Sequence, residues 1–406
     1  MFVWIPRYAY KITNQTIDIE FLYGNTNYYL EETKVVETNE DGTEKIDYVP
    51  EIKDIIQKEG YKVHPSFTNG TNTNYTNGEW NEEINGFWVA KYVAGFQDST
   101  ITHKANGEEI YPTSQNIIYS EEAYTSYNNS NTHNALGQDL SSNSYATQRI
   151  SYPVFKPLTY SYNLISTGDC YTISQKIAET SGFYGLNSNQ TQSHMMKNSE
   201  WGAVVYLTQS KYGKNGVEVV QNTKNLNNKD NKNVYAVTGY AGNVANGVSA
   251  SSTNNMSGVF DLNGCVWEFV TGYISNGNDS LLKYGNSYVS VEGADEEAYK
   301  TKSTKDVTIY PYDSLLDNAN NNWNRYNQLK TTEYGYGDAI LETSTMGEGY
   351  TSWNNDHSEF AYQERTFLVR GGSFGSIATN GGIFAFYPTN GACNEYAGFR
   401  VVLIGK

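Results

Sequence analysis

The 406-residue sequence is poor in basic residues and contains no long apolar run. Its 28 Lys and Arg residues are outnumbered by 44 Asp and Glu residues, which gives a formal net charge of −16. A chain of this charge repels phosphate backbones and anionic membranes, so we expect no nucleic-acid partner. The longest uncharged apolar run, Trp201 to Leu207, is too short to cross a bilayer, and the first residues lack the basic and apolar regions of a signal peptide. We therefore expect no direct membrane insertion.

Cysteine and proline are also scarce, with 3 and 8 residues. Cys170, Cys265 and Cys393 do not have the spacing of metal ligands, and three cysteines permit at most one disulfide. These numbers argue against a disulfide scaffold. We expect Cys170 and Cys265 to be small buried apolar residues.

Tyrosine, asparagine and turn-forming pairs are abundant instead. The chain has 36 Tyr residues, and Asn-Gly or Asp-Gly pairs recur from Asp41-Gly42 to Asn390-Gly391. Such pairs favour tight turns with positive φ, and only short apolar segments separate them. We therefore expect an α+β protein of short strands and long loops with few helices. Hydrophobic spacing and capping residues predict helices at 172–181 and 199–210 and strands at 2–12, 17–22 and 87–96.

The chain is interpreted as one domain, 1–406, because no internal repeat and no Pro-rich or Gly/Ser-rich linker divides it. Three polar segments are predicted to be insertions, at about 25–60, 99–151 and 275–365. The last segment, 367–406, differs from them. Between an Arg-Gly-Gly-Ser and a Gly-Phe-Arg it has Gly, Ser, Asn, Thr and aromatic residues with almost no charge, which is the composition of a recognition surface.

Short motifs along the whole chain resemble, in the same order, landmarks of the formylglycine-generating (sulfatase-modifying) enzyme family. The matching segments are 2–6 (FVWIP), 87–92 (FWVAKY), 198–201 (NSEW), 258–269 (GVFDLNGCVWEF), 370–373 (RGGS) and 398–400 (GFR). The resemblance implies a C-type-lectin-like fold, α+β, with two helices, short antiparallel sheets and long loops. It also suggests structural roles for four residues. Trp267 would be an aromatic plug of the core, Glu268 a carboxylate beside it, and Arg370 and Arg400 buried tethers of the terminal loops.

The family's enzymatic chemistry does not transfer with the motifs. Its oxidases use two cysteines shortly after the Arg-Gly-Gly-Ser, whereas 374–386 contains none and Cys393 stands alone. The five histidines are scattered without the clustering that an iron site needs. We therefore assign no catalytic residue and no cofactor. Loops rich in Asp, Asn and Glu can supply the oxygen ligands that calcium prefers, but no ligand spacing assigns a site.

The chain also resembles large lectin-fold proteins of Firmicutes and their phages, and its C-terminal segment resembles the variable region of proteins diversified by retroelements. Those systems change adenines in AAC and AAT codons. From Phe374 to Ala397 only Glu395 cannot arise in this way, so Glu395 is assigned to a fixed position. Alternation in 383–387 places Phe384 and Phe386 on the core face and Ile383, Ala385 and Tyr387 on the other face.

These observations predict a non-enzymatic receptor-recognition protein, on a phage tail tip or a bacterial surface, whose ligand is a cell-surface protein or glycan. Two alternatives remain, a metal-dependent oxidase like the family's enzymes and a structural virion or surface protein. The predicted ligand-binding residues are Phe374, Ser376, Ile377, Thr379, Ala385, Tyr387, Pro388, Ala392, Cys393 and Tyr396.

Overall fold

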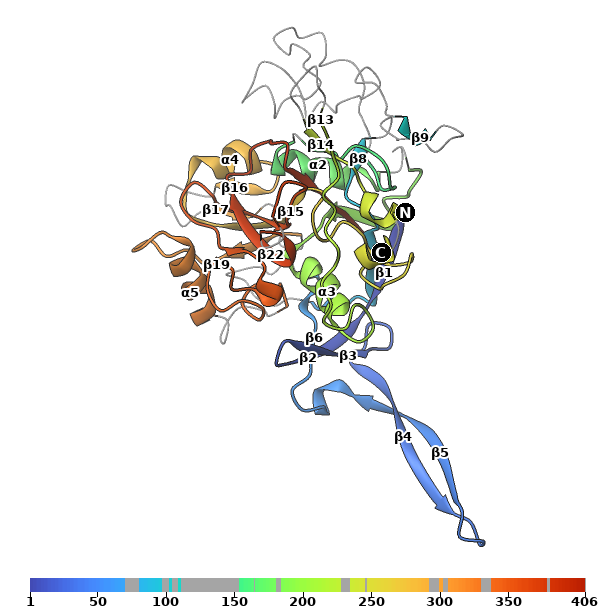
Figure 1. Cartoon of the computed structure of the whole chain (residues 1–406). Coiled ribbons are helices and arrows are strands. Elements are labelled where there is room, and N and C mark those ends of the chain that lie inside the picture. The colour runs from blue at the N-terminus through green and yellow to red at the C-terminus, as the bar shows by residue number, and fades with distance from the viewer. Residues whose placement is uncertain are drawn as a thin grey trace.

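The computed structural model describes residues 1–69, 80–96, 102–103, 109–110, 153–163, 165–179, 184–227, 234–244, 247–291, 299–301, 306–329, 337–377 and 380–405. These residues form an α+β fold of short strands, four α-helices and long loops, from which one hairpin extends (Figure 1). The α-helices are α2 (Thr167–Lys176), α3 (Asn198–Gln209), α4 (Asp279–Gly285) and α5 (Ala319–Leu329). Single 3-10 turns occur at Ile55–Gln57, Pro65–Phe67, Tyr240–Asn243, Gly247–Ala250 and Trp353–Asn355.

An antiparallel sheet joins the two ends of the chain. Its strand order is β1 (Phe2–Pro6), β7 (Gly86–Ala90), β24 (Val401–Gly405) and β12 (Thr191–Met195). Because β7 pairs antiparallel with both β1 and β24, the first and last strands of the chain run parallel to each other on either side of it.

A second sheet of seven strands carries the C-terminal segment. Its path is β18 (Thr308–Tyr310), β15 (Trp267–Ile274), β21 (Phe367–Gly371), β22 (Gly382–Thr389), β20 (Ser358–Glu359) and β19 (Glu348–Gly349), with β23 (Ala397–Phe399) also paired to β15. Three of its pairings are parallel, namely β15 with β18, β15 with β23, and β20 with β22. The sheet is therefore mixed rather than purely antiparallel, because strands distant in sequence are brought side by side by loops instead of hairpin turns.

The remaining sheets are small. One has three strands, β3 (Thr16–Phe21), β2 (Tyr8–Thr13) and β6 (Lys62–Val63). The two-stranded sheets are β4 (Tyr28–Thr38) with β5 (Glu44–Asp54), β9 (Thr102–His103) with β10 (Glu109–Ile110), β8 (Gly95–Phe96) with β11 (Pro153–Val154), β13 (Asn225–Asn227) with β14 (Val234–Ala236), and β16 (Val289–Val291) with β17 (Tyr299–Thr301).

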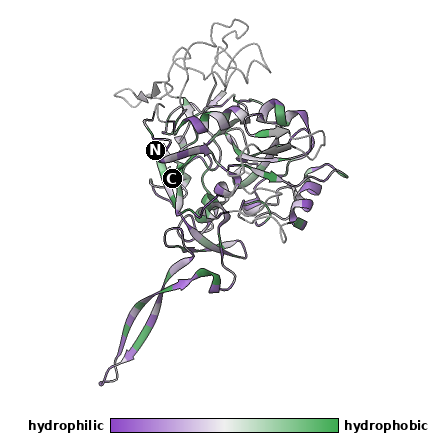
Figure 2. Ribbon diagram, turned by 180° about the vertical axis from the view of Figure 1, so that it is seen from behind, coloured by the Kyte–Doolittle hydropathy of each residue, from purple (hydrophilic) through white to green (hydrophobic). Residues whose placement is uncertain are grey.

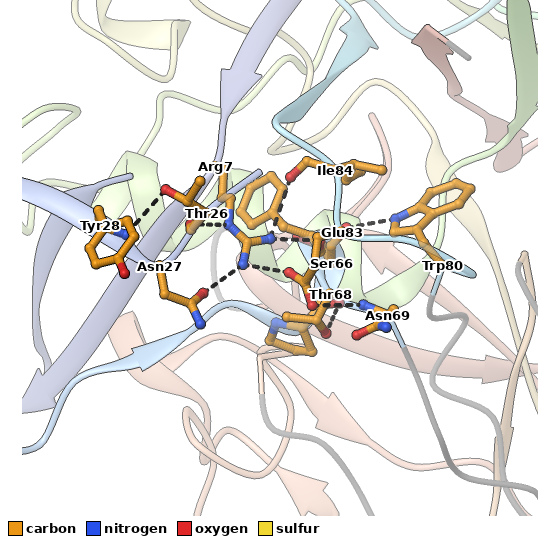
Figure 3. Close-up of polar contacts among 12 residues, drawn as sticks. Arg7, Thr26, Asn27, Tyr28, Ser66, Thr68, Asn69, Trp80, Glu83 and Ile84 are labelled. Carbon is orange, nitrogen blue, oxygen red and sulfur yellow. Dashed lines mark hydrogen bonds and ion pairs between the residues drawn. The ribbon is translucent and has the colours of Figure 1, made fainter. Parts of the chain in front are cut away.

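The predicted strand at 2–12 is two strands, β1 and β2, separated at Arg7. The Arg7 guanidinium is buried and donates to the carbonyl oxygens of Thr26 and Phe67 and to Asn27 Oδ1. It also pairs with Glu83 at 2.5 Å (Figure 3). This cluster ties the chain around the break to three later segments, at 26–27, 67 and 83, and periodicity in the sequence cannot indicate such contacts.

The helices begin and end at residues other than those predicted. Helix α2 begins at Thr167, five residues earlier than predicted, because Ser166 accepts a hydrogen bond from the Asp169 amide as its N-cap. Thr172 lies within the helix, where its hydroxyl donates to the Gly168 carbonyl. Lys197, rather than Asn198, occupies the N-cap of α3, and its amide donates to the Glu200 carboxylate.

Two helices were not predicted, α4 and α5, and both lie in the segment 275–365. The sequence of α5 is rich in Asn, which is a poor helix former, but Trp323 and Tyr326 are three residues apart and both are buried. Tyr310 and Phe360 of the same segment pack against Tyr326. The segment thus contributes aromatic side chains to the core. Most of the predicted insertion at 99–151 lies outside the described residues.

None of the helices in the described ranges is both long and apolar enough to cross a membrane.

Candidate functional site

The candidate site is a stacked pair of aromatic rings, Trp267 and Tyr387, with an open hollow on each side. The ring centroids are 5.6 Å apart and the planes differ by 27°. Trp267 is the first residue of β15, and Tyr387 lies near the end of β22. Strand β21 lies between these two strands, so the sheet fixes the separation of the two rings.

Each hollow has a volume of about 490 Å³. Three aromatic residues line both hollows, namely Trp267, Tyr387 and Tyr396. The first hollow is further lined by Glu364, Arg365, Val369, Pro388, Thr389, Asn390, Asn394 and Ala397. The second is further lined by His357, Glu359, Ser373, Gly375, Ser376 and Asn380. The surface therefore combines three aromatic rings with hydroxyls, amides and charges of both signs.

Hydrogen bonds and ring contacts hold Tyr387 in place. Its hydroxyl accepts a hydrogen bond from Arg365 Nη1 at 2.9 Å, and its ring centroid is 5.4 Å from that of His357. Arg365 Nη1 lies 3.8 Å from a Glu359 oxygen, and His357 Nε2 lies 3.5 Å from the other. Partial burial lowers the pKa of Arg365, but Tyr387 and Glu359 more than offset this and raise it above its ordinary value. Arg365 is therefore a fixed positive charge at the rim.

The loop 373–377 is held by its backbone. Gln221 Nε2 donates to the carbonyl oxygens of Ser373 and Ser376, at 3.3 and 2.9 Å, and the Ser373 amide donates to Ser376 Oγ. Tyr396 stacks on Phe374 with ring centroids 5.2 Å apart and remains 42% exposed. Phe374 is thus the support of an exposed ring.

Two buried arginines anchor the strands beneath the site. Arg370 donates to the carbonyl oxygens of Ala385, Asp338 and Ala339 and to Asn198 Oδ1, at 2.7 to 2.9 Å. Burial lowers the pKa of Arg370 to about 10, so it is still protonated at neutral pH. These hydrogen bonds join β22 to the start of helix α3 and to the loop that contains Asp338 and Ala339.

Arg400 forms a two-point ion pair with Glu268, at 2.8 and 2.6 Å, and also donates to the carbonyl oxygens of Ala90 and Phe260. Burial raises the pKa of Glu268, and the Arg400 charge opposes that rise. Glu268 was expected beside an aromatic plug of the core, and it is buried. Trp267 was expected to be that plug; it packs against the core, but it is only half-buried and lines both hollows.

The structure places the predicted ligand-binding residues in different environments. Ser376, Tyr387, Pro388 and Tyr396 line the hollows, although Pro388 itself is largely buried. Ile377 is 63% exposed beyond the second hollow. Ala392 and Cys393 are half-buried and line neither hollow. Thr379 lies outside the described residues.

Two predicted contact residues are buried and line neither hollow, and for these the prediction was wrong. Ala385 is 0% exposed, and so is its neighbour Ile383, which alternation had also turned outward. The reason is that β22 lies inside the sheet with apolar contacts on both faces, so both sets of alternating side chains are covered. Phe374 is 8% exposed because Tyr396 covers it.

Several residues of the site were not found from the sequence. His357, Glu359, Glu364 and Arg365 belong to a segment predicted to be an insertion, and they reach the site because Ser358 of β20 pairs in parallel with Phe386 of β22. A two-residue strand has no recognisable pattern. No signal in the sequence therefore pointed to these four residues.

In the described part of the chain no disulfide joins the three cysteines, of which Cys170 and Cys265 are buried and Cys393 is half-buried. Burial raises the pKa of both buried thiols well above its ordinary value. Across the described part of the chain, no three His, Cys, Asp or Glu side chains are grouped in a way that could hold a metal ion.

No family model matches the sequence, and no curated protein sequence matches it. Among solved structures, the chain is similar to Treponema denticola variable protein 1 at 10% sequence identity, over 82% of this chain and 99% of that one. The TM-score of 0.25 is too low for the two folds to be equated.

Proposed function

We propose that this protein is a non-enzymatic ligand-binding protein, and that the surface around Trp267 and Tyr387 is its contact surface. The observation that carries the proposal is the stacked pair between two open hollows of about 490 Å³ each. Aromatic rings held rigidly beside adaptable polar groups are typical of recognition surfaces, because they provide contact area at a low cost in side-chain entropy.

The proposed ligand is a protein or glycan of a cell surface, and this protein is proposed to act on a phage tail tip or a bacterial surface. Sugar rings stack on aromatic faces, and the amides of Asn380, Asn390 and Asn394 can bond to hydroxyls or to backbone groups. Arg365 and Glu359 supply one charge of each sign. The net charge of −16 disfavours a nucleic-acid ligand.

We further propose that the C-terminal segment is diversified, and burial restricts where this can occur. Residues 382–386 are buried in β22, so substitutions there would disrupt the core. The side chains at 377, 389–390, 392–394 and 396 are exposed or half-buried and can change at little cost in stability. Variation is therefore expected at these positions and absent from 382–386.

Sequencing of the gene in a population of the source organism tests this proposal. Adenine-directed substitutions at codons 377, 389–390, 392–394 and 396, with codons 382–386 and the gene outside 374–397 constant, would support a diversified binder. Variation spread evenly over 374–397, or none in this window, would contradict diversification.

Binding is tested with fluorescently labelled protein on a glycan array and on intact bacteria. Tyr396→Ala removes an exposed ring and is expected to weaken binding at least about tenfold, as loss of a contact hot spot does. Tyr23→Ala removes a ring that is 49% exposed elsewhere and is the matched control. Protease treatment of the cells identifies a protein ligand, and periodate treatment identifies a glycan. Equal binding by both variants would contradict the assignment of this surface.

A further inference from the structure

The β4–β5 hairpin extends from the body as a long two-stranded arm (Figure 1). Its register is unbroken over eleven residue pairs, from Tyr28↔Asp54 to Thr38↔Glu44. A two-stranded hairpin without a packing partner is marginally stable in water, so an arm of this length needs a reason to persist.

The root of the arm is firmly attached. Arg7 bonds to Thr26 and Asn27 immediately before β4 (Figure 3). Tyr29, in the second pair, is 3% exposed and packs in a small apolar cluster with Leu22 and Ile55. The arm therefore leaves the body in a fixed direction.

The two faces of the arm differ in chemistry, because residues directly opposite in an antiparallel pair share a face. One face carries the pairs Tyr29↔Lys53, Glu31↔Glu51, Thr33↔Val49, Val35↔Asp47 and Glu37↔Lys45, and its exposed apolar side chains are Val35 and Val49. Most of its charges are already compensated, since Lys53 pairs with Glu31 and Glu51, and Lys45 pairs with Asp47.

The other face is apolar at both ends and charged in the middle. Its four central rows, from root to tip, are Leu30/Ile52, Glu32/Pro50, Lys34/Tyr48 and Val36/Ile46. Their apolar side chains are exposed, from 43% for Leu30 to 70% for Ile52, and hydrophobic stretches are visible on both strands (Figure 2). In the described structure neither Glu32 nor Lys34 forms a salt bridge. We call this side the apolar face.

We propose that the apolar face binds the apolar face of a second copy of this chain around a twofold axis. The axis lies between the two faces, perpendicular to the strands and midway between the Glu32/Pro50 and Lys34/Tyr48 rows. It places Glu32 of each copy opposite Lys34 of the partner, and Leu30 opposite Val36.

The charges select this register. An axis through the Glu32 row would set two carboxylates against each other, and an axis through the Lys34 row would oppose two ammonium groups. Only the midway position pairs opposite charges while it covers the apolar rows, including Ile52 on Ile46 and Pro50 on Tyr48. Pro50 also lacks a backbone donor, which discourages addition of a further strand at the edge.

The size of the face predicts a weak dimer. Eleven residues at about 3.4 Å each, and a width of about 10 Å, give a contact of about 370 Å² per copy. The total of about 750 Å² lies below the usual range of stable complexes, so we expect a weak dimer with a dissociation constant of about 10 to 100 μM. The two bodies would lie at opposite ends of a shared four-stranded stalk.

Sedimentation velocity of the full chain between about 1 and 100 μM tests the proposal. We expect a concentration-dependent shift from monomer to dimer. In the dimer, residue 32 of each copy lies opposite residue 34 of the other, so there are two such contacts. Glu32→Lys alone or Lys34→Glu alone makes both contacts repulsive, and each variant should raise the dissociation constant at least about tenfold. The double variant Glu32→Lys/Lys34→Glu restores opposite charges and should dimerise like the unaltered chain.

Glu37→Lys, a charge reversal on the opposite face of the same strand, is the matched control and should leave dimerisation unchanged. All these side chains are exposed, and circular dichroism checks that each variant is folded. A chain that is monomeric at 100 μM overturns the proposal. So does a double variant that associates as weakly as the single ones, or a Glu37→Lys variant that is weakened equally.

Discussion

Replacement of Arg400 by Met is expected to destabilise the protein strongly, because it leaves the Glu268 carboxylate buried without a counter-charge. Arg400 and Glu268 are 0% and 1% exposed in their side chains, and two hydrogen bonds of 2.6 and 2.8 Å join them. Removal of one partner from such a pair costs about 3–5 kcal/mol. The carbonyl groups of Ala90 and Phe260 also lose a donor, at about 1 kcal/mol each.

A double-mutant cycle separates the ion pair from the other contacts. Glu268→Met alone strands the guanidinium, whereas Arg400→Met with Glu268→Met removes both charges. We expect the double variant to be more stable than the sum of the single effects predicts, by about 2–3 kcal/mol, as for neighbours that interact directly. Denaturant unfolding followed by tryptophan fluorescence measures each free energy of unfolding, with the m-value as a check that the variants unfold similarly.

The pH dependence of the Arg400→Met variant gives an independent test. Burial already raises the pKa of Glu268, and loss of the Arg400 charge raises it further. A carboxyl group whose pKa is raised in the folded state binds its proton more tightly there, so its contribution to stability is present at low pH and is lost as the pH rises through the folded-state pKa. The variant should therefore lose less stability at pH 5 than at pH 8. A loss below about 1 kcal/mol at both values, or strictly additive single effects, would refute a closed buried ion pair.

Three further predictions concern the strands and loops near the site. Gly382→Ala is expected to cost several kcal/mol, because φ is +124° and an added Cβ would lie 2.0 Å from Asp356 Oδ1; thermal unfolding measures this. Burial first, and then the Glu218 charge, raise the pKa of Asp356 well above its usual range. Because its carboxyl group holds a proton more tightly in the folded state, the free energy of unfolding should fall as the pH rises from 5 to 8. The Asp356→Asn variant should show a smaller fall. Titration of the folded protein with a thiol reagent should modify Cys393 first, because the other two cysteines are buried; simultaneous reaction of all three would contradict their burial.

The sequence predicts local elements better than it predicts the site. Periodicity located α3 within one residue at each end, because Trp201, Val204 and Val205 mark a helix with buried sides. It failed at α5, where Asn residues conceal two core aromatics, and at β22, where burial of both faces makes alternation uninformative. In each failure the tertiary environment decided the outcome, and local sequence carries no record of it.

The site itself is assembled by contacts between distant segments. Trp267 was expected to be a core plug because of the family motif that contains it, but β15 starts at Trp267, and its half-buried ring stacks on Tyr387. The second ring, Tyr387, was expected at the surface. What the sequence could not indicate is that Arg365 and His357 hold that ring from outside the C-terminal segment.

This arrangement separates the residues that hold the surface from those that can contact a ligand. Arg370 binds the carbonyl oxygen of Ala385, and Gln221 binds the carbonyl oxygens of Ser373 and Ser376, so in both places the anchored group is backbone. A backbone acceptor is the same whichever side chain the residue carries. The exposed side chain at 377 can therefore change while these anchors stay in place, whereas the half-buried Ser376 also accepts a hydrogen bond from the Ser373 amide through its Oγ. Tyr387 is different, because its hydroxyl and ring are themselves part of the support, and its replacement should loosen the surface as well as alter it. For that reason Tyr396, rather than Tyr387, is the position where loss of binding can be separated from loss of structure.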